Sequence, residues 1–355
     1  MRKLTFLLLS AVLVCRLLIP FPSLAEECAV SARHAILYEP VTGAVLFEKD
    51  AHSPAPMAST TKIMTALVAL KHGNLEDVLV IPREACGIEG SSVYLEEGER
   101  LTLGELLYAL LLQSANDAAT AIALHVGGSI DGFAALMNEE ADSLGLEHTH
   151  FTNPHGLDDP LHYTTAYDLA RITAAAMEYP LFCDMVKTVK HTIPHATSDG
   201  VRLLVNHNKL LRMYDGATGV KTGFTKKCGR CLVGAAERDG LTFITVTLNA
   251  PSDWSDHTRM LDLGFSLMEN RLLAAVGEVR YALPVLGKEA TRFCVNCEPI
   301  YAILPKDAPA PSMTLDLPHY LTPNQKKGAS VGEVHFTYQG KVVASAPLLI
   351  DKNTP

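Results

Sequence analysis

The sequence predicts an α+β protein, and three observations support this. Apolar runs typical of strands stand at both ends of residues 26–275, and apolar helical segments lie between them. A sheet assembled from both ends of a segment, with a helical region inserted, is an α+β arrangement. Residues 276–355 contain only short strand-like runs and turns, which predicts a small all-β second domain. With 355 residues, the chain is long enough for one large core and this smaller domain.

The expected strands pair as hairpins. Residues 33–47 contain two apolar runs around a turn with proline and glycine, and residues 232–247 contain two more around an Asp-Gly turn. In the second domain, residues 336–344 contain short strand-like runs around a Gln-Gly turn. The proline-rich stretch 305–311 is expected to be a loop of that domain.

Helical segments fill the middle of the first domain. Thr102 to Glu105 form a capping box, in which the two side chains satisfy free N–H groups at a helix start. The helix that follows is expected to end near Leu112. The other expected helices cover residues 57–70, 117–126, 131–143, 165–179 and 256–272.

Residues 1–25 have the features of a secretory signal peptide. Arg2 and Lys3 precede a mostly apolar stretch, and Ser23-Leu24-Ala25 is a small-residue cleavage site. We therefore expect an exported, extracytoplasmic protein that begins at Glu26 and lies on the cell-wall or periplasmic side or is secreted. The alternative is an uncleaved N-terminal anchor. No later hydrophobic run approaches membrane-spanning length.

Charge and cysteine content restrict the partners. The formal net charge is −9, and it becomes −12 without residues 1–25, which carry three basic and no acidic side chains. An acidic body disfavours a nucleic-acid partner. Two C-x-x-C pairs, Cys228/Cys231 and Cys294/Cys297, are compatible with free thiols, local disulfides or zinc, although zinc knuckles usually lie closer together. We expect no metal and no cofactor, and the odd number of seven mature cysteines leaves at least one thiol without an intrachain partner.

Three short motifs occur once each, in the order Ser59-Thr60-Thr61-Lys62, Ser114-Ala115-Asn116 and Lys221-Thr222-Gly223. Each alone has a structural explanation, because serine and asparagine cap helices and a lysine before a glycine can lie on an edge strand. Together they are the elements found in penicillin-binding proteins and class A β-lactamases. The set predicts a serine acyl-transfer site that needs no histidine.

The first two motifs supply a nucleophile and its proton-transfer partners. Ser59 and Lys62 are three residues apart at an expected helix start, so they share one face. A serine hydroxyl needs a base, and a lysine whose pKa is lowered by burial and a nearby cation can act as one. The apolar residues after Lys62 predict a central helix. We expect Ser114 to relay a proton to the leaving amine and Asn116 to donate to the substrate's amide carbonyl.

The third motif is expected to bind the substrate. Lys221 and Thr222 would face the cleft and bind a carboxylate, and Gly223 would let an extended ligand lie against the strand. The backbone N–H groups of Ser59 and Phe224 are candidates for an oxyanion hole, which needs no particular side chain.

Nearly the whole chain resembles the D-alanyl-D-alanine carboxypeptidases among the low-molecular-mass penicillin-binding proteins. The resemblance implies a β-lactamase/transpeptidase-like domain, with an antiparallel sheet and a helical subdomain, followed by the family's small β domain. It implies removal of the terminal D-alanine from peptidoglycan stem pentapeptides through an acyl-enzyme on Ser59, and covalent inhibition by β-lactam antibiotics. Beyond the three motifs it rests on residues 38–43, 56–58, 151–157, 163–168 and 219–220.

Some features depart from that family. Relatives often end in a basic amphipathic helix that holds them on the membrane, whereas the sequence before Pro355 has no such helix, so no C-terminal anchor is expected and membrane contact is left open. Cys228 stands where a small residue such as alanine is expected, and Cys294 and Cys297 are not family features. His155 and His162, near the implied site, are expected to be structural.

Three other functions remain as alternatives. A class A β-lactamase deacylates with a glutamate in an E-x-x-L-N segment, which the sequence lacks. A DD-endopeptidase or transpeptidase would share the same acyl-enzyme. A non-catalytic penicillin-binding sensor module can lose a motif residue, whereas all of them are intact in this sequence.

Overall fold

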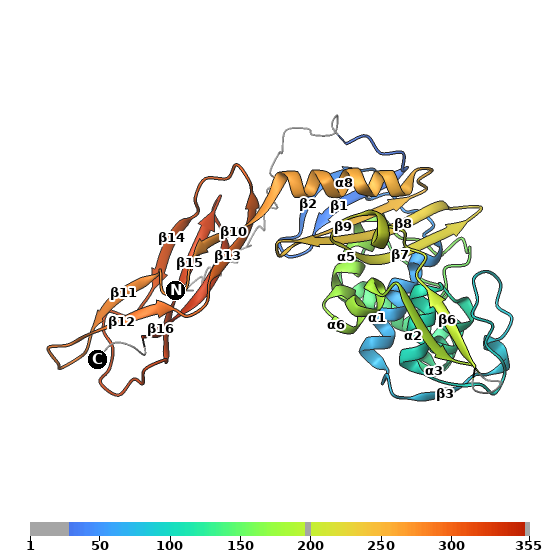
Figure 1. Ribbon diagram of the computed structural model, residues 1–355, viewed down its shortest axis with the longest axis horizontal. Helices are drawn as coiled ribbons and strands as arrows, with labels where there is room; N and C mark the ends of the chain where they lie inside the picture. The colour runs from blue at the N-terminus through green and yellow to red at the C-terminus, as the bar shows by residue number, and fades with distance from the viewer. Residues whose placement is uncertain (1–27, 196–199, 352–355) are drawn as a thin grey trace, which may run out of the picture.

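The computed structural model describes residues 28–195 and 200–351. The molecule is elongated, with a larger domain of sheet and helices and a smaller domain of strands (Figure 1). The predicted signal peptide lies outside the described residues. Within these ranges, no single helix has the length and apolar composition to cross a membrane, although one bent helix pair passes that test when its members are taken together.

A five-stranded antiparallel sheet forms the centre of the larger domain, in the order β2-β1-β9-β8-β7. The first two strands come from the start of the chain and the other three from beyond the helices, and β1 pairs directly with β9. This confirms the predicted sheet from both ends of the segment. The strands are β1 (His34–Glu39), β2 (Ala44–Lys49), β7 (Ala217–Thr225), β8 (Gly229–Arg238) and β9 (Leu241–Leu248).

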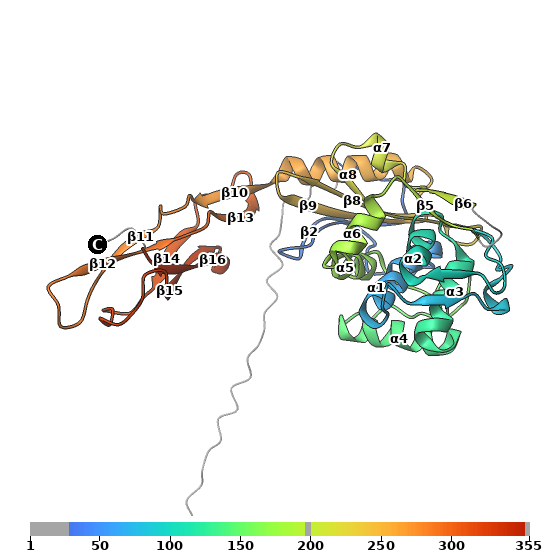
Figure 2. The ribbon, with the colours of Figure 1, turned by 60° about the horizontal axis from the view of Figure 1, so that its bottom comes forward.

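Helices cover both faces of this sheet, as Figure 2 shows. The helix α8 (Asp253–Leu267) packs on one face, where Phe243 of β9 meets Phe265 edge-on with ring centroids 5.0 Å apart. Neighbouring Ile244 points to the other face and joins the core formed with the helices on that side. Because both faces are covered, most residues of β8 and β9 are buried, and the exposed Arg230 and Glu237 lie near the ends of β8.

Most helices of the second layer agree closely with the sequence pattern. The predicted capping box is present, since Thr102 accepts a hydrogen bond from the Glu105 backbone N–H and the glutamate side chain accepts one from the Thr102 N–H. The second layer consists of α1 (Lys62–His72), α2 (Leu103–Leu112), α3 (Asn116–Gly127), α4 (Ile130–Ser143), α5 (Ala166–Met177) and α6 (Pro180–Lys187). The short helix α7 (Leu210–Met213) lies on the other face, where Leu210 packs in the same cluster as Met260 and Leu261 of α8.

Two regions differ from the sequence prediction. The helix expected over residues 256–272 is wrong at its end, because α8 stops at Leu267 and Met268–Ala274 form strand β10, paired with β13 (Ile300–Pro305). A short apolar segment suits either conformation, and pairing with a distant strand decides between them. The helix α6 and the hairpin of β5 (Lys190–Pro194) and β6 (Val201–Val205) were not predicted.

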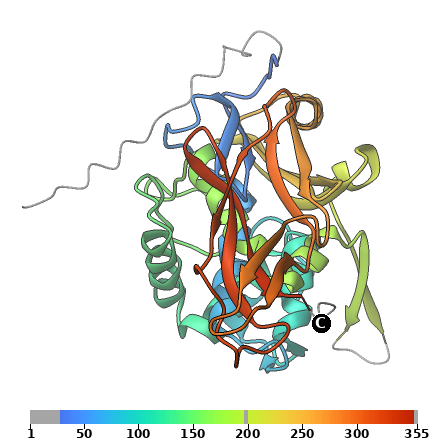
Figure 3. The ribbon, with the colours of Figure 1, turned by 90° about the vertical axis from the view of Figure 1, so that its left-hand side faces the viewer.

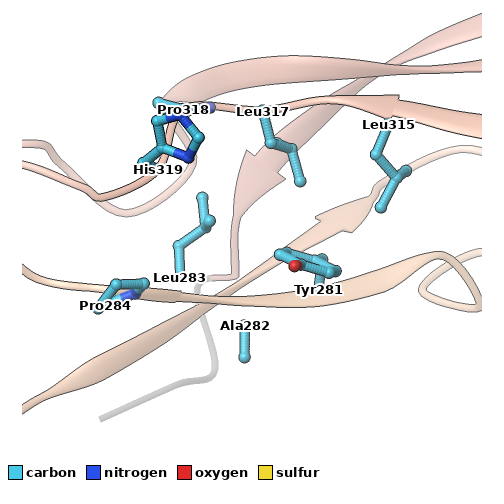
Figure 4. Close-up of a pocket in the computed structure, with 8 residues that line it drawn as sticks. All are labelled: Tyr281, Ala282, Leu283, Pro284, Leu315, Leu317, Pro318 and His319. Atoms are coloured by element: carbon cyan, nitrogen blue, oxygen red, sulfur yellow. The ribbon is translucent and has the colours of Figure 1, made fainter.

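The smaller domain contains the expected strands and turn. Its five-stranded sheet has the order β11-β12-β16-β15-β14, and the residues before β14 form the expected proline-rich loop. A pocket of about 360 Å³ lies in this domain, and Figure 4 shows Leu283 among the residues that line it, facing Leu317 and His319. The strands of this sheet are β11 (Arg280–Pro284), β12 (Thr291–Asn296), β14 (Ser312–Asp316), β15 (Ser330–Tyr338) and β16 (Lys341–Ile350). In the larger domain, β3 (Val78–Val80) pairs with β4 (Arg100–Thr102) as a separate two-stranded sheet.

Candidate active site

The three motifs meet where the edge strand β7 lies against the start of α1. Ser59 is in a 3-10 turn, Ala58–Thr61, directly before the α-helix, so the single helix predicted from residue 57 is in fact two consecutive elements. Gly223 of β7 packs on this turn so closely that an added Cβ would lie 3.1 Å from the backbone nitrogen of Ser59. The candidate nucleophile and the third motif therefore touch through backbone atoms.

The backbone before Ser59 is held in an uncommon conformation. Ala58 has a φ of 48°, in the left-handed region that non-glycine residues seldom adopt. Gly156 packs against it, and a Cβ at this glycine would lie 1.9 Å from the Ala58 carbonyl oxygen. A side chain at residue 156 would displace the turn that presents Ser59.

The Lys62 side chain is completely buried and makes three polar contacts. Its Nζ lies 2.9 Å from Ser59 Oγ, 2.6 Å from Asn116 Oδ1 and 2.8 Å from the His155 carbonyl oxygen. Carbonyl oxygens can only accept hydrogen bonds. A neutral amine therefore gives its two N–H groups to Asn116 and His155, and its lone pair is left facing the Ser59 hydroxyl. That is the geometry of a general base.

The environment favours the neutral form of Lys62. Burial lowers its pKa well below the usual value, the nearby Lys221 lowers it further, and the Asp117 carboxylate opposes both effects. Lys221 is also buried, and burial lowers its own pKa to about 7. Burial and the neighbouring Lys221 therefore shift the Lys62 pKa in the direction that a general base requires.

The middle motif forms the wall of the site. Ser114 follows α2 with a φ of 60° and is buried, and this turn brings Asn116 to the start of α3. One amide N–H of Asn116 is bonded to the Glu89 carbonyl oxygen, which fixes the orientation of the side chain with Oδ1 toward Lys62. The second amide N–H is left to reach a substrate carbonyl.

The motif on β7 has one buried and two partly exposed members, and the exposed Phe224 follows it. Lys221 Nζ donates to the Thr222 carbonyl oxygen at 3.0 Å, which leaves further donors for a ligand anion. Thr222 and Gly223 are partly exposed, and the Phe224 side chain is 66% exposed. The backbone N–H groups of Ser59 and Phe224 thus belong to two elements in contact, as an oxyanion hole requires.

Asp117 contributes to the site and was not predicted from the sequence, although it directly follows Asn116. Its fully buried carboxylate accepts hydrogen bonds from the Ser92 hydroxyl at 2.5 Å and from the backbone N–H groups of Val93 and Leu95 at 3.2 and 3.0 Å. These bonds hold the 92–95 loop against the middle motif. The same charge influences the pKa of Lys62.

A buried ion pair supports the same wall. Arg202 of β6 forms a two-pronged salt bridge with Glu99 and also donates to the Tyr94 carbonyl oxygen at 3.0 Å. It fastens the β5–β6 hairpin, yellow-green in Figure 3, to the loop that leads into β4. Glu99 and Arg202 are 103 residues apart in the chain, so no local pattern in the sequence predicts this ion pair.

The two histidines have structural roles. His162 Nδ1 accepts from the Thr152 backbone N–H at 3.1 Å, so its Nε2 carries the proton and donates to Thr61 Oγ1 at 2.8 Å. Burial lowers the His162 pKa to about 4, and burial together with Lys62 lowers the His155 pKa to about 3. Both rings are therefore neutral near pH 7. In the described part of the chain, no group of three or more His, Cys, Asp or Glu side chains is placed to hold a metal ion.

Comparison with known proteins decides the family. The family described as D-alanyl-D-alanine carboxypeptidase, peptidase S11, matches residues 22–252. The chain belongs to this family. It is 32% identical over 334 residues to the D-alanyl-D-alanine carboxypeptidase DacF of Bacillus subtilis, covering 91% of this chain and 86% of that protein. It is 31% identical over 349 residues to DacA of Escherichia coli K12, covering 92% and 84% of the two chains.

Solved structures of S11 and related enzymes share the fold. The D-alanyl-D-alanine carboxypeptidase DacD from Francisella tularensis superposes with a TM-score of 0.66 at 26% identity, covering 92% of this chain and 94% of its own. The Streptomyces K15 DD-transpeptidase gives a TM-score of 0.64 at 34% identity, covering 67% of this chain and 98% of its own. The protein is thus a serine peptidase of the transpeptidase/β-lactamase fold, and the predicted fold class and family are confirmed.

Proposed function

We propose that this protein removes the terminal D-alanine from peptidoglycan stem peptides through an acyl-enzyme on Ser59. The observation that carries the proposal is the contact set of Lys62, because its two carbonyl partners leave the amine lone pair directed at the Ser59 hydroxyl. The family membership supports the same substrate class.

Acylation follows from this arrangement. Ser59 Oγ attacks the carbonyl carbon of the penultimate D-alanine while Lys62 Nζ takes its proton. The N–H groups of Ser59 and Phe224 stabilise the negative charge on the carbonyl oxygen of the tetrahedral intermediate. The proton passes through Ser114 to the amine of the terminal D-alanine, which leaves. Water then hydrolyses the ester, with Lys62 again accepting a proton.

Lys221 and Thr222 select the substrate by its free carboxylate. A buried ammonium that donates to an anion gives a strong charge-assisted hydrogen bond. β-Lactam antibiotics carry a carboxylate at a comparable place, so the same contacts would position them for covalent reaction with Ser59.

The direct test is to incubate the purified protein with a muropeptide that ends in D-Ala–D-Ala. Release of one alanine by the native enzyme, and none by Ser59→Ala, is the expected result. Added amine acceptor distinguishes the transpeptidase alternative, which would yield an amide product instead of free acid. Penicillin should label Ser59 in peptide mapping, and an adduct on another residue would contradict the assignment.

We also propose that the enzyme acts outside the cytoplasm after export. The support is the signal-peptide pattern of residues 1–25. N-terminal sequencing of the exported protein should find Glu26 first, and an intact N-terminus would favour the anchored alternative.

A further inference from the structure

A pair of cysteines lies on the hairpin that carries the substrate-binding strand. Cys231 of β8 is the direct strand partner of Gly223, and Cys228 closes the turn between β7 and β8. Both side chains are buried, and each is a thiol in this structure. The established chemistry of the site uses neither of them.

The two thiols lie on one face of the hairpin and border the site. Cys231 is paired with Gly223 and Cys228 contacts Thr225, two residues further along β7, and each thiol shifts the pKa of the other. Cys228 Sγ also lies 2.9 Å from Thr225 Oγ1, which donates to Asp158 Oδ1 at 2.9 Å. Cys231 Sγ lies 4.0 Å from the Pro56 carbonyl oxygen, three residues before Ser59.

The pair is also chemically asymmetric. The neighbouring Cys231 lowers the pKa of Cys228 to about 7, whereas the pKa of Cys231 is raised well above its usual value. A low-pKa thiol next to a protonated one is the arrangement of an attacking and a resolving cysteine.

We propose that Cys228 and Cys231 are a redox modification site, which forms a reversible disulfide that slows acylation of Ser59. A hydroperoxide is the oxidant, because a small reagent suits buried thiols. The Cys228 thiolate attacks the peroxide, the O–O bond breaks, and a sulfenic acid and hydroxide result. The Cys231 sulfur then attacks the Cys228 sulfur, and the sulfenic oxygen leaves as water with the thiol proton. In total, two thiols and one hydrogen peroxide give one disulfide and two waters.

The disulfide would act on acylation through the backbone. An S–S bond is about 2.05 Å long, so the two sulfur atoms must come closer together when the disulfide forms. This movement would change the contacts of Cys231 with Pro56 and of Cys228 with Thr225. Because Cys231 is paired with Gly223, and Gly223 is packed on the nitrogen of Ser59, a shift of the β8 backbone would reach the turn that carries the nucleophile. A displacement of about 1 Å at a reacting centre can cost on the order of 100-fold in rate.

The test begins with the chemistry of the thiols. The exported protein is treated with hydrogen peroxide, free thiols are alkylated, and trypsin is added. Trypsin cuts after Lys227, Arg230 and Arg238, which separates residues 228–230 from residues 231–238. The disulfide joins these two peptides, with two hydrogens fewer than their combined mass. Dithiothreitol should separate them again.

Acylation is measured in the same samples with a fluorescent penicillin. We expect oxidation to slow labelling at least about 10-fold, dithiothreitol to restore it, and Cys228→Ala to label equally fast with and without peroxide. Cys297→Ala, in the other C-x-x-C pair, should remain sensitive. If Cys228→Ala does not fold, Cys231→Ala replaces it.

Three results would overturn the inference. These are absence of the linked peptide after oxidation, a linked peptide with unchanged labelling, or peroxide sensitivity that persists in Cys228→Ala. The effect on labelling rests on the proposed acyl-enzyme, but the linked peptide does not. If the reduced enzyme does not label at all, the proposed function fails, whereas the disulfide is judged from the peptides.

Discussion

Lys221 should make the preference for a free carboxylate depend on pH. The proposed change is to the substrate, in which the terminal D-alanine carboxylate is replaced by a carboxamide. Lys221 is buried, so its charge-assisted hydrogen bond to the carboxylate is worth about 1.5–3 kcal/mol. At about 1.4 kcal/mol per factor of ten, this corresponds to roughly 10–150-fold in kcat/KM.

The pH dependence follows from the depressed pKa of Lys221. In the free enzyme the ammonium is present below pH about 7 and is lost above it. Binding of a carboxylate favours the charged form, so above pH 7 the enzyme must take up a proton when it binds. This costs about 1.4 kcal/mol per pH unit, and the preference for the acid should shrink by up to about tenfold per unit. Lys62 titrates equally for both substrates, so its effect cancels in the ratio.

The assay compares release of D-alanine with release of D-alaninamide between pH 6 and 9. Lys221→Gln is the matched variant, because it keeps much of the side-chain volume without the charge. For Lys221→Gln we expect the ratio of kcat/KM for the acid to kcat/KM for the amide to be small and independent of pH. The reason is that the substitution and the amidation of the substrate remove the same interaction. A native ratio that stays constant with pH, or equal ratios in both enzymes, would refute the role of Lys221.

Three further predictions concern the buried charges. Lys62→Arg should keep the circular dichroism spectrum but lose penicillin labelling, because arginine does not release its proton at working pH. Near-normal labelling of this variant would contradict the role of Lys62 as the base. In the native enzyme, penicillin labelling should fall on acidification as Lys62 becomes protonated. Asp117→Asn should slow labelling because the 92–95 loop is released, and it should move the acid limb of the pH–rate profile to lower pH, because the lost charge had raised the Lys62 pKa. A slower rate without that displacement would leave Asp117 a purely structural role. Arg202→Ala should lower the free energy of unfolding by about 3–5 kcal/mol in urea titrations, since it leaves Glu99 buried without its partner; a change below about 1 kcal/mol would show that water reaches the pair.

Local sequence signals determined most of the elements and predicted the reacting groups. The capping box at Thr102, the hairpins and the helix positions follow from interactions within a few residues, and the structure agrees with them. The spacing of Ser59 and Lys62 is also local, because residues three apart share one face of a helical turn. The same reasoning failed beyond Leu267, where pairing with a strand 26 to 37 residues further along the chain decides the conformation.

Tertiary structure decided what makes these groups reactive. The two carbonyl partners that orient Lys62 come from positions 54 and 93 residues away, and Lys221 and Asp117, which act on its pKa, approach from two other elements. The contact of Cys231 with the backbone before Ser59 likewise joins β8 to a segment 175 residues earlier. Periodicity reports which side of an element is apolar, but desolvation and charge interactions depend on which distant segments pack together. For that reason the sequence alone predicted the nucleophile and its base, and only the fold shows why the pKa of the base is lowered and which cysteines border the site.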